Sequence, residues 1–206
     1  MPRPLAAPDF RLFLGKSGSG KSYLARYQAS SARRLLIHDP NGEAAWQEGA
    51  LVIHDRAGLV EAMKGRAWRI CWRGSVAARG DAEMRDAFEW ANRCALAAGD
   101  CLVIWDEVDR FTDAGRLPPA AYQMVNAGRH RGVKIYACSR RVRRVSRDLS
   151  ANAGRVILFR MTEPGDLRWI NDTMGAEAAA AAPRLGEHVA LDWTEREVKQ
   201  KKSPFR

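Results

Sequence analysis

The chain has 206 residues and a hydrophobic content of 46%, which is ordinary for a globular domain of this length. Its net charge is +10, from 34 lysines and arginines against 24 acidic residues, and such an excess favours a polyanionic partner. No apolar run is long enough to cross a bilayer, the N-terminus has no signal-peptide core, and the four cysteines lack CxxC spacing, so we expect no membrane span, secretory leader or zinc site.

The first predicted element is an apolar strand over 10–14, which leads directly into a glycine-rich turn and a helix. The turn, Gly15-Lys-Ser-Gly-Ser-Gly-Lys21-Ser22, fits the pattern GxxxxGK[ST]. Glycines allow successive backbone N–H groups to converge on a polyphosphate, and the N-terminus of the following helix favours negative charge. We therefore predict a nucleoside triphosphate site whose binding residues are Gly15, Lys16, Ser17, Gly18, Ser19, Gly20, Lys21 and Ser22.

Two residues of this turn have predicted chemical roles. Lys21 would reach the β- and γ-phosphates, and the Ser22 hydroxyl would ligate Mg²⁺. The alternative interpretation is a chance glycine-rich turn before a helix. The strand before the turn and the helical sequence Tyr-Leu-Ala-Arg-Tyr-Gln after it favour nucleotide binding.

Apolar runs and helical spacing alternate along the rest of the chain. Further strands are predicted at 35–38, 52–54, 68–73, 101–105, 132–138, 155–159 and 188–192. Helices are predicted from the turn to about 30 and at 59–64, 81–98, 118–128, 164–174 and 178–182. This alternation predicts an α/β fold with a mainly parallel central sheet flanked by helices. We expect a leader over 1–9, one P-loop domain over 10–194 and a basic tail over 195–206.

Asp106 and Glu107 directly follow the run 101–105, which is apolar throughout, as a strand buried on both faces requires. At this position Asp106 would hold Mg²⁺ through its water shell, and Glu107 would polarise a water for in-line attack on the γ-phosphate. An acidic pair at a strand end is also a common surface feature, but the phosphate-binding turn upstream favours catalysis. The adjacent glutamate, and the lack of an NKxD-like guanine reader, indicate ATP hydrolysis. The predicted cofactors are ATP and Mg²⁺.

Ser139 directly follows the strand predicted at 132–138 and precedes a strongly basic stretch. Polar residues at the carboxyl end of a strand beside the phosphate-loop strand can sense the γ-phosphate, so Ser139 is a candidate sensor, with an ordinary strand-end serine as the alternative. No residue from Ala114 to Arg147 is acidic. A block of one charge sign is costly unless an anion neutralises it, although a solvated basic face is the alternative. The predicted DNA-binding residues are Arg140, Arg141, Arg143, Arg144 and Arg147.

The order of these motifs resembles the FtsK–HerA superfamily of DNA-pumping P-loop ATPases. Three further stretches carry the resemblance: His38-Asp-Pro-Asn-Gly-Glu43, residues 128–138 and residues 148–167. The chain is most similar to the genome-packaging ATPases of icosahedral viruses with internal membranes. Such a resemblance implies a single ASCE-type, RecA-like motor domain. The chain departs from the family pattern at Ser139, where the family usually has glutamine.

The resemblance also implies an activity and partners. We expect an ATPase that moves double-stranded DNA into a viral capsid as a homo-oligomeric ring, with six subunits and ATP between them. Arg155 is the implied trans arginine finger and Arg129 the second candidate. A capsid vertex or viral membrane protein is a further implied partner, and the implied location is the host cytoplasm or the virion.

Two alternatives stay open at this point. A filamentous-phage assembly or conjugation-type motor shares the same core, and we would expect it to carry a transmembrane or additional domain. A small-molecule P-loop kinase is the alternative from another functional class, and the basic block would then form its lid.

Overall fold

One nine-stranded sheet runs through the molecule, in the order β3-β4-β2-β5-β6-β1-β7-β8-β9. The computed structural model describes residues 10–74, 80–112, 116–194 and 197–202. The strands are β1 (Phe10–Leu14), β2 (Arg34–His38), β3 (Leu51–Ile53), β4 (Trp68–Trp72), β5 (Leu102–Trp105), β6 (Lys134–Ser139), β7 (Arg155–Phe159), β8 (Val189–Thr194) and β9 (Glu197–Lys202). The pairs from β3 to β7 are parallel, and β8 and β9 are antiparallel. The predicted mainly parallel sheet is confirmed.

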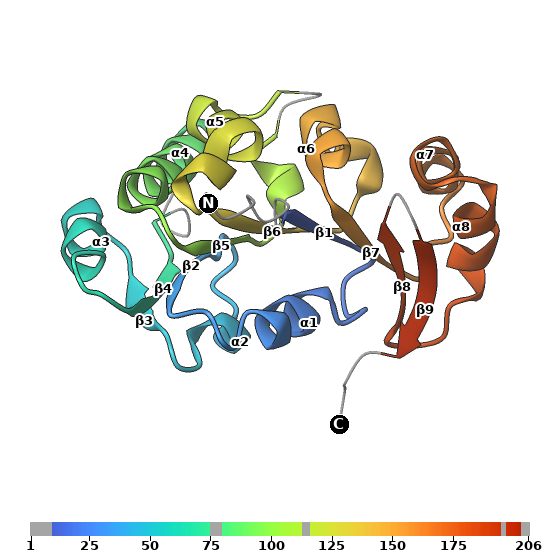
Figure 1. Cartoon of the computed structure of the whole chain (residues 1–206), viewed down its shortest axis with the longest axis horizontal. Coiled ribbons are helices and arrows are strands. Elements are labelled where there is room, and N and C mark those ends of the chain that lie inside the picture. The colour runs from blue at the N-terminus through green and yellow to red at the C-terminus, as the bar shows by residue number, and fades with distance from the viewer. Residues whose placement is uncertain (1–9, 75–79, 113–115, 195–196, 203–206) are drawn as a thin grey trace, which may run out of the picture.

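Helices cover both faces of the sheet (Figure 1). One face of the sheet is covered by α1 (Lys21–Gln28) and α2 (Ala44–Gln47). The other face is covered by α4 (Asp81–Ala98), α5 (Pro119–Ala127) and α6 (Arg147–Asn152). Towards the two ends of the sheet lie α3 (Arg56–Ala62), α7 (Pro164–Met174) and α8 (Ala176–Ala181). Single 3-10 turns are η1 (Val108–Arg110), η2 (Gly128–Arg131), η3 (Val142–Arg144) and η4 (Ala182–Arg184).

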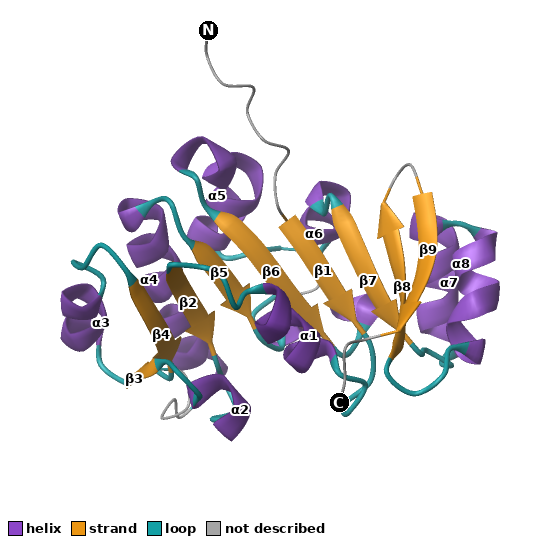
Figure 2. Cartoon of the chain, turned by 60° about the horizontal axis from the view of Figure 1, so that its bottom comes forward, coloured by secondary structure: helices purple, strands orange, loops and turns teal. Residues whose placement is uncertain are grey.

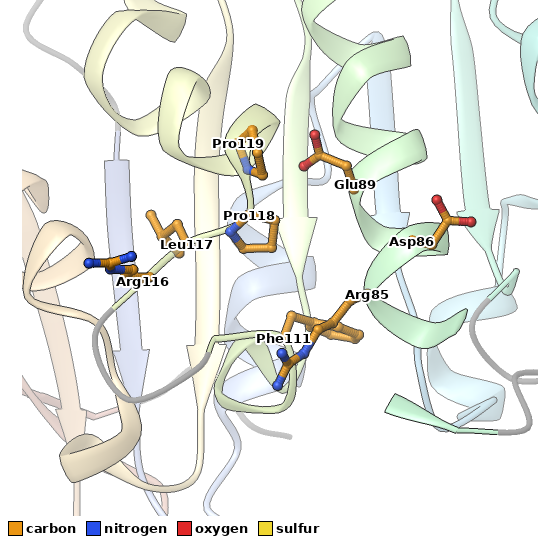
Figure 3. Close-up of a pocket in the computed structure, with 8 residues that line it drawn as sticks. All are labelled: Arg85, Asp86, Glu89, Phe111, Arg116, Leu117, Pro118 and Pro119. Carbon is orange, nitrogen blue, oxygen red and sulfur yellow. The ribbon is translucent and has the colours of Figure 1, made fainter. Parts of the chain in front are cut away.

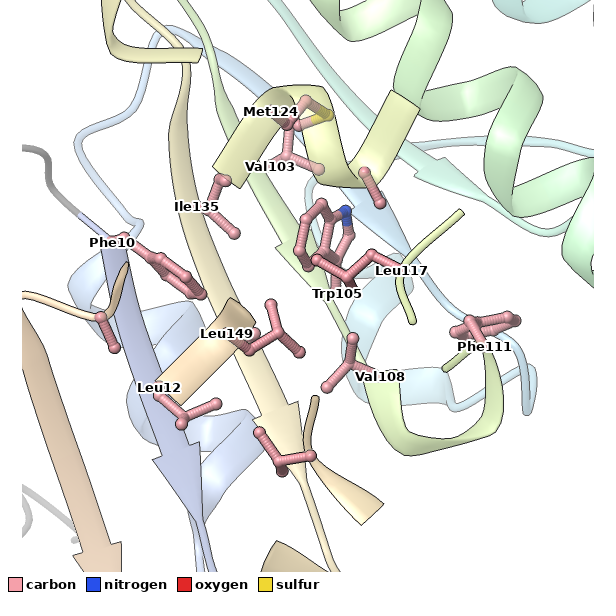
Figure 4. Packing of buried hydrophobic residues seen from close by; sticks show 14 of the residues in the cluster. Phe10, Leu12, Val103, Trp105, Val108, Phe111, Leu117, Met124, Ile135 and Leu149 are labelled. Atoms are coloured by element: carbon pink, nitrogen blue, oxygen red, sulfur yellow. The ribbon is translucent and has the colours of Figure 1, made fainter. Parts of the chain in front are cut away.

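The central strands are largely apolar, and β5 is apolar throughout, because each face of the sheet packs against its own hydrophobic cluster. In β5, Leu102 and Ile104 join the cluster on the α1 face, whereas Val103 and Trp105 join the cluster under α4, α5 and α6. Figure 4 shows Trp105 in the second cluster, with Met124 of α5 near it. The residues that directly follow a strand continue this alternation, so it determines the face of the sheet to which each of their side chains points.

The longest helix, α4, is the one with the clearest helical spacing in the sequence. Its Met84, Phe88, Ala91 and Ala95 are all buried, and the helix ends at Gly99, whose φ of 59° lies in the left-handed region. The predicted bounds 81–98 coincide with the observed ones.

The region expected to be a basic tail includes β9, which pairs with β8 along its length. β9 is the last strand in the sheet order, so the apolar pattern of a central strand is absent from its sequence, Glu-Val-Lys-Gln-Lys-Lys. The helices α2 and α6 were also not predicted, because four and six residues are too few to show helical spacing. Within the described residues, no helix is both long enough and apolar enough to span a membrane.

Candidate functional site

The glycine-rich turn lies where the parallel strands end, at the carboxyl edge of the sheet (Figure 2). The turn leaves β1 beside β6, and Gly15 N donates to Ser139 O at 3.3 Å. A Cβ on Gly15 would lie 2.7 Å from Phe159 Cβ, so only glycine fits there. Gly20 takes φ 98° and precedes the first residue of α1, where a left-handed conformation again favours glycine. The turn therefore has the glycines at positions that require them.

Lys21 is the first residue of α1, and its side chain turns back over the loop. It is only 6% exposed, and its Nζ donates to the Lys16 carbonyl at 2.9 Å. Burial lowers the pKa of Lys21 below its usual value. A desolvated ammonium that caps its own loop is preorganised for an anion in the same space.

Asp106 points to the same side of the sheet as α1, because it continues the alternation of Leu102 and Ile104. Its Oδ1 accepts from the Ser22 hydroxyl at 3.3 Å, and its Oδ2 accepts from Trp46 Nε1 at 2.9 Å. Burial raises the pKa of Asp106 to about 7, and the charges of Glu43 and Glu107 add to that effect. A cation bound beside this carboxylate would lower its pKa and favour the ionised form at neutral pH.

These residues fit a magnesium ion that is held partly by the protein and partly by the phosphates of a nucleotide. Ser22, Asp106 and Lys21 line one cavity of about 310 Å³, and the serine and aspartate oxygens are hard ligands of the kind Mg²⁺ prefers. In the described part of the chain, no group of three or more His, Cys, Asp or Glu side chains forms a metal cage. The remaining ligands would therefore come from phosphate oxygens and water, as is usual for Mg²⁺.

Glu107 lies next to Asp106 and lines the same cavity. It is 5% exposed and has a backbone φ of 47°, which is uncommon for a residue with a Cβ. Its Oε1 lies 2.6 Å from Arg140 Nη2, and its Oε2 lies 3.8 Å from Arg110 Nη1. The predicted catalytic carboxylate therefore sits at the cavity in an ion pair.

The loop after β2 supplies two residues to this region. Asp39 is fully buried, and its Oδ1 accepts from the backbone N–H groups of Asn41, Gly42 and Glu43 at 2.9–3.2 Å. This loop places Glu43 at the cavity wall and begins α2, which carries Trp46 to Asp106. Sequence reasoning did not identify Trp46, whose only signal was its position just after the Asp39–Glu43 motif.

The backbone carbonyl of Ser139 contacts the phosphate loop, but its side chain points to the face of the sheet opposite α1. In β6, Tyr136 and Cys138 belong to the α1 face, so Ser139 points to the other one, where its hydroxyl donates to Asp109 Oδ1 at 3.0 Å. Cys138 and Arg140 are the residues of this segment that line the cavity. The sensor role of Ser139 stays a prediction.

The two arginine finger candidates lie at the amino edge of the sheet, away from the phosphate loop. Arg155 begins β7 and pairs with Asp192 of β8. Arg129 is exposed in η2, before β6. A trans finger acts on a neighbouring subunit, so these roles also stay predictions.

The predicted DNA-binding arginines divide into two groups. Arg140 lines the cavity and forms an ion pair with Glu107. The other four are exposed and follow it through η3 into the start of α6: Arg141, Arg143, Arg144 and Arg147.

A second hollow of about 500 Å³ lies between α4 and the start of α5 (Figure 3). It contains none of the predicted site residues. Glu89 in its wall accepts from the backbone N–H of Ala120 at 2.9 and 3.1 Å, which satisfies the first turn of α5. Glu89 therefore links α4 to the start of α5 in the wall of this hollow.

Comparison with solved structures identifies the fold. The chain superposes on the genome-packaging NTPase B204 of Sulfolobus turreted icosahedral virus 2, in complex with AMPPCP, with a TM-score of 0.76 and 20% identity over 98% of this chain and 100% of that one. For B204, the DNA-packaging ATPase of Sulfolobus turreted icosahedral virus, the TM-score is 0.76 at 21% identity, over 97% and 100%. For VirB4 of Thermoanaerobacter pseudethanolicus it is 0.73 at 12% identity, over 100% and 92%.

No protein-family model and no curated protein sequence matches the chain. The similarity is therefore one of fold, and it agrees with the resemblance carried by the sequence motifs. The chain has the P-loop ATPase fold that B204 and VirB4 share.

Proposed function

We propose that this protein is an ATPase that moves double-stranded DNA into a viral capsid. The observation that carries the proposal is the convergence of Lys21, Ser22, Asp106 and Glu107 on one cavity at the carboxyl edge of the sheet. The similarity of fold to B204, a genome-packaging NTPase that the match covers completely at 20–21% identity, supports the packaging role. The basic segment after β6 is the surface we assign to the DNA backbone.

The residues divide the work of hydrolysis between them. Lys21 and the backbone N–H groups of the turn hold the β- and γ-phosphates. Mg²⁺, when bound through Ser22 and Asp106, neutralises charge on the phosphate oxygens. Glu107 accepts a proton from the attacking water and orients that water in line with the γ-phosphate. An arginine of the adjacent subunit, Arg155 or Arg129, completes the site in a ring.

Two other functions are compatible with the fold. VirB4 and the conjugation coupling protein TcpA, with TM-scores of 0.73 and 0.58, keep a conjugation-type motor as an alternative. A small-molecule kinase would need an acceptor pocket beside the γ-phosphate. The cavity that Lys21 lines is also lined by Glu107 and Arg140, and a carboxylate at this place favours water as the acceptor.

Two substitutions test the assignment of the site. Lys21→Ala should weaken ATP binding at least tenfold, because the buried ammonium that faces the phosphates is lost. Glu107→Gln should still bind ATP but should lower kcat by about 10²- to 10⁴-fold, as expected for loss of a general base. Binding is measured by titration calorimetry and turnover by phosphate release.

Lys64→Ala is the matched control for Lys21→Ala. Lys64 pairs with Glu61 on the surface, so its loss should change neither ATP affinity nor turnover. If Lys21→Ala and Glu107→Gln both hydrolysed ATP at the wild-type rate, the assignment of the site would be wrong.

A further inference from the structure

The ion pair between Glu107 and Arg140 connects the nucleotide cavity to the surface. The side chain of Glu107 is 7% exposed, whereas that of Arg140 is 43% exposed, and the atoms that join them are 2.6 Å apart. One partner is therefore enclosed at the reaction site and the other is accessible from outside. A ligand that binds Arg140 at the surface can therefore change the interactions of the buried Glu107 carboxylate.

In this arrangement Glu107 is not free to bind an attacking water. A general base needs an oxygen within about 2.6–3.2 Å of the proton donor, and Oε1 is already bound to the guanidinium. Oε2 has no hydrogen-bond partner among the described residues, but it is buried and the Arg110 guanidinium lies 3.8 Å from it, so it is not open to water in this arrangement. The left-handed backbone of Glu107, with φ 47°, is a conformation that persists only when its surroundings hold it. The structure therefore describes a restrained Glu107.

The basic segment begins at Arg140 itself. Four exposed arginines follow it within seven residues, at 141, 143, 144 and 147. A nucleic-acid backbone bound along them presents phosphates at a spacing of a few ångströms per nucleotide. Guanidinium binds phosphate as readily as carboxylate, often through two parallel hydrogen bonds. A phosphate at Arg141 would therefore compete with Glu107 for the neighbouring Arg140.

We propose that Arg140 is a positioning residue that keeps Glu107 out of catalysis until a backbone phosphate of bound duplex DNA takes its guanidinium. This inference rests on the proposed function. The exchange replaces a guanidinium–carboxylate pair by a guanidinium–phosphate pair, so Arg140 keeps an anionic partner. Glu107 keeps the Arg110 guanidinium, 3.8 Å from its Oε2, and its Oε1 becomes free for water. One charge-assisted hydrogen bond changes the equilibrium between restrained and free Glu107 about ten- to a hundredfold. Because Arg140 is exposed, solvent screening should keep the change near tenfold.

The test compares DNA-free and DNA-stimulated turnover in the 206-residue chain and three variants: Arg140→Ala, Arg140→Lys and Arg168→Ala. Arg140→Ala should raise the DNA-free kcat about tenfold, leave the KM for ATP within about twofold, and reduce the stimulation by duplex DNA to a similar extent. Arg140→Lys should lie between wild type and Arg140→Ala, since an ammonium still pairs with Glu107 but cannot bind it through two nitrogens. Arg168, exposed on α7, is the matched control, and its loss should leave the DNA-free rate unchanged.

A DNA-free kcat of Arg140→Ala at or below the wild-type value overturns the proposal. A raised KM for ATP together with a lower kcat would instead place Arg140 on the nucleotide. Either result leaves the proposed function standing if the wild-type protein hydrolyses ATP and responds to DNA. If Arg140→Ala does not fold, Arg140→Lys carries the test, because a DNA-free rate equal to wild type or lower overturns the proposal in the same way.

Discussion

At the scale of single residues, Asp106 shows how a functional group lowers the stability of the fold that holds it. Burial raises its pKa from the usual 3.8 to about 7. Between these two pH values the folded chain binds a proton that the unfolded chain has lost, so stability falls as pH rises through this window. Above about pH 7 the cost is constant and amounts to at most about 4 kcal/mol, from 1.36 kcal/mol for each pH unit. Binding of a metal ion would release the proton and offset the cost.

Asp106→Asn should therefore stabilise the protein at the same time as it abolishes magnesium-dependent hydrolysis. The gain in the free energy of unfolding should be larger at pH 8 than at pH 5, because the wild-type carboxyl is mostly protonated at the lower pH. Urea denaturation without metal or nucleotide at the two pH values measures the difference. Asp172→Asn, at an exposed position of α7, is the control. An equal effect of Asp106→Asn at both pH values would contradict the raised pKa.

The residues of the site differ in how well the sequence predicts them. Lys21, Ser22, Asp106 and Glu107 follow from local patterns, because a glycine-rich turn and an apolar strand each fix the position of the next side chain. The contact of Arg140 with Glu107 does not follow from a pattern of this kind. It depends on how the ends of β5 and β6 lie side by side, although the alternation of β6 already placed Cys138, and with it Arg140, on the α1 face.

At the scale of elements, the loop between β2 and α2 positions the site through one buried aspartate. Asp39 accepts three backbone N–H groups, and Arg73 Nε lies 3.1 Å from its Oδ2. The side chain of Arg73 is only 13% exposed. Without the carboxylate, the nearly buried guanidinium of Arg73 would lose its ion pair with Asp39. The loop that carries Glu43 would also lose the hydrogen bonds that its backbone N–H groups donate to Asp39.

Asp39→Ala should destabilise the fold by about 3–5 kcal/mol, the usual effect of removing one partner of a buried ion pair. It should also weaken ATP binding, because α2 would no longer hold Trp46 against Asp106. Asp55→Ala is the matched control: Asp55 accepts from Gly58 N at 2.8 Å and caps α3, so its loss should cost about 1 kcal/mol and leave ATP affinity unchanged. Thermal unfolding and calorimetric titration measure both effects. Equal losses of ATP affinity in the two variants would remove the special role of Asp39.

The elements themselves were predictable where packing imposes a period. β5 and α4 are buried strongly enough that their sequences carry the pattern of a central strand and of an amphipathic helix. β9 and α6 are not, since an edge strand and a six-residue helix depend on neighbours that are distant in sequence. The phosphate loop could be predicted for a third reason, because its glycines are required by backbone geometry.

At the scale of the whole molecule, the proposed ring requires a residue from one subunit at the site of the next. Arg155→Ala, mixed in increasing fractions with wild-type subunits, should lower ATPase activity more than in proportion to its fraction if Arg155 is that residue. Its pairing with Asp192 means that the substitution also removes a structural contact. Asp192→Asn breaks the same pair but keeps the arginine, so it should not reduce activity out of proportion. A proportional loss with Arg155→Ala would remove the finger hypothesis.

The excess of basic residues, 34 against 24 acidic ones, belongs to the same scale, because it predicts how the protein binds DNA. Contacts to backbone phosphates release counterions, so binding should weaken steeply with salt and depend little on DNA sequence.

Steady-state ATP hydrolysis by the wild-type protein, with and without duplex DNA over a range of salt concentrations, tests the central claim most directly. We predict turnover that requires Mg²⁺, rises when duplex DNA is added, and loses that rise as salt increases, whatever the sequence of the DNA. A protein that does not turn over ATP, or one whose turnover is the same with duplex DNA at every salt concentration, would contradict the account.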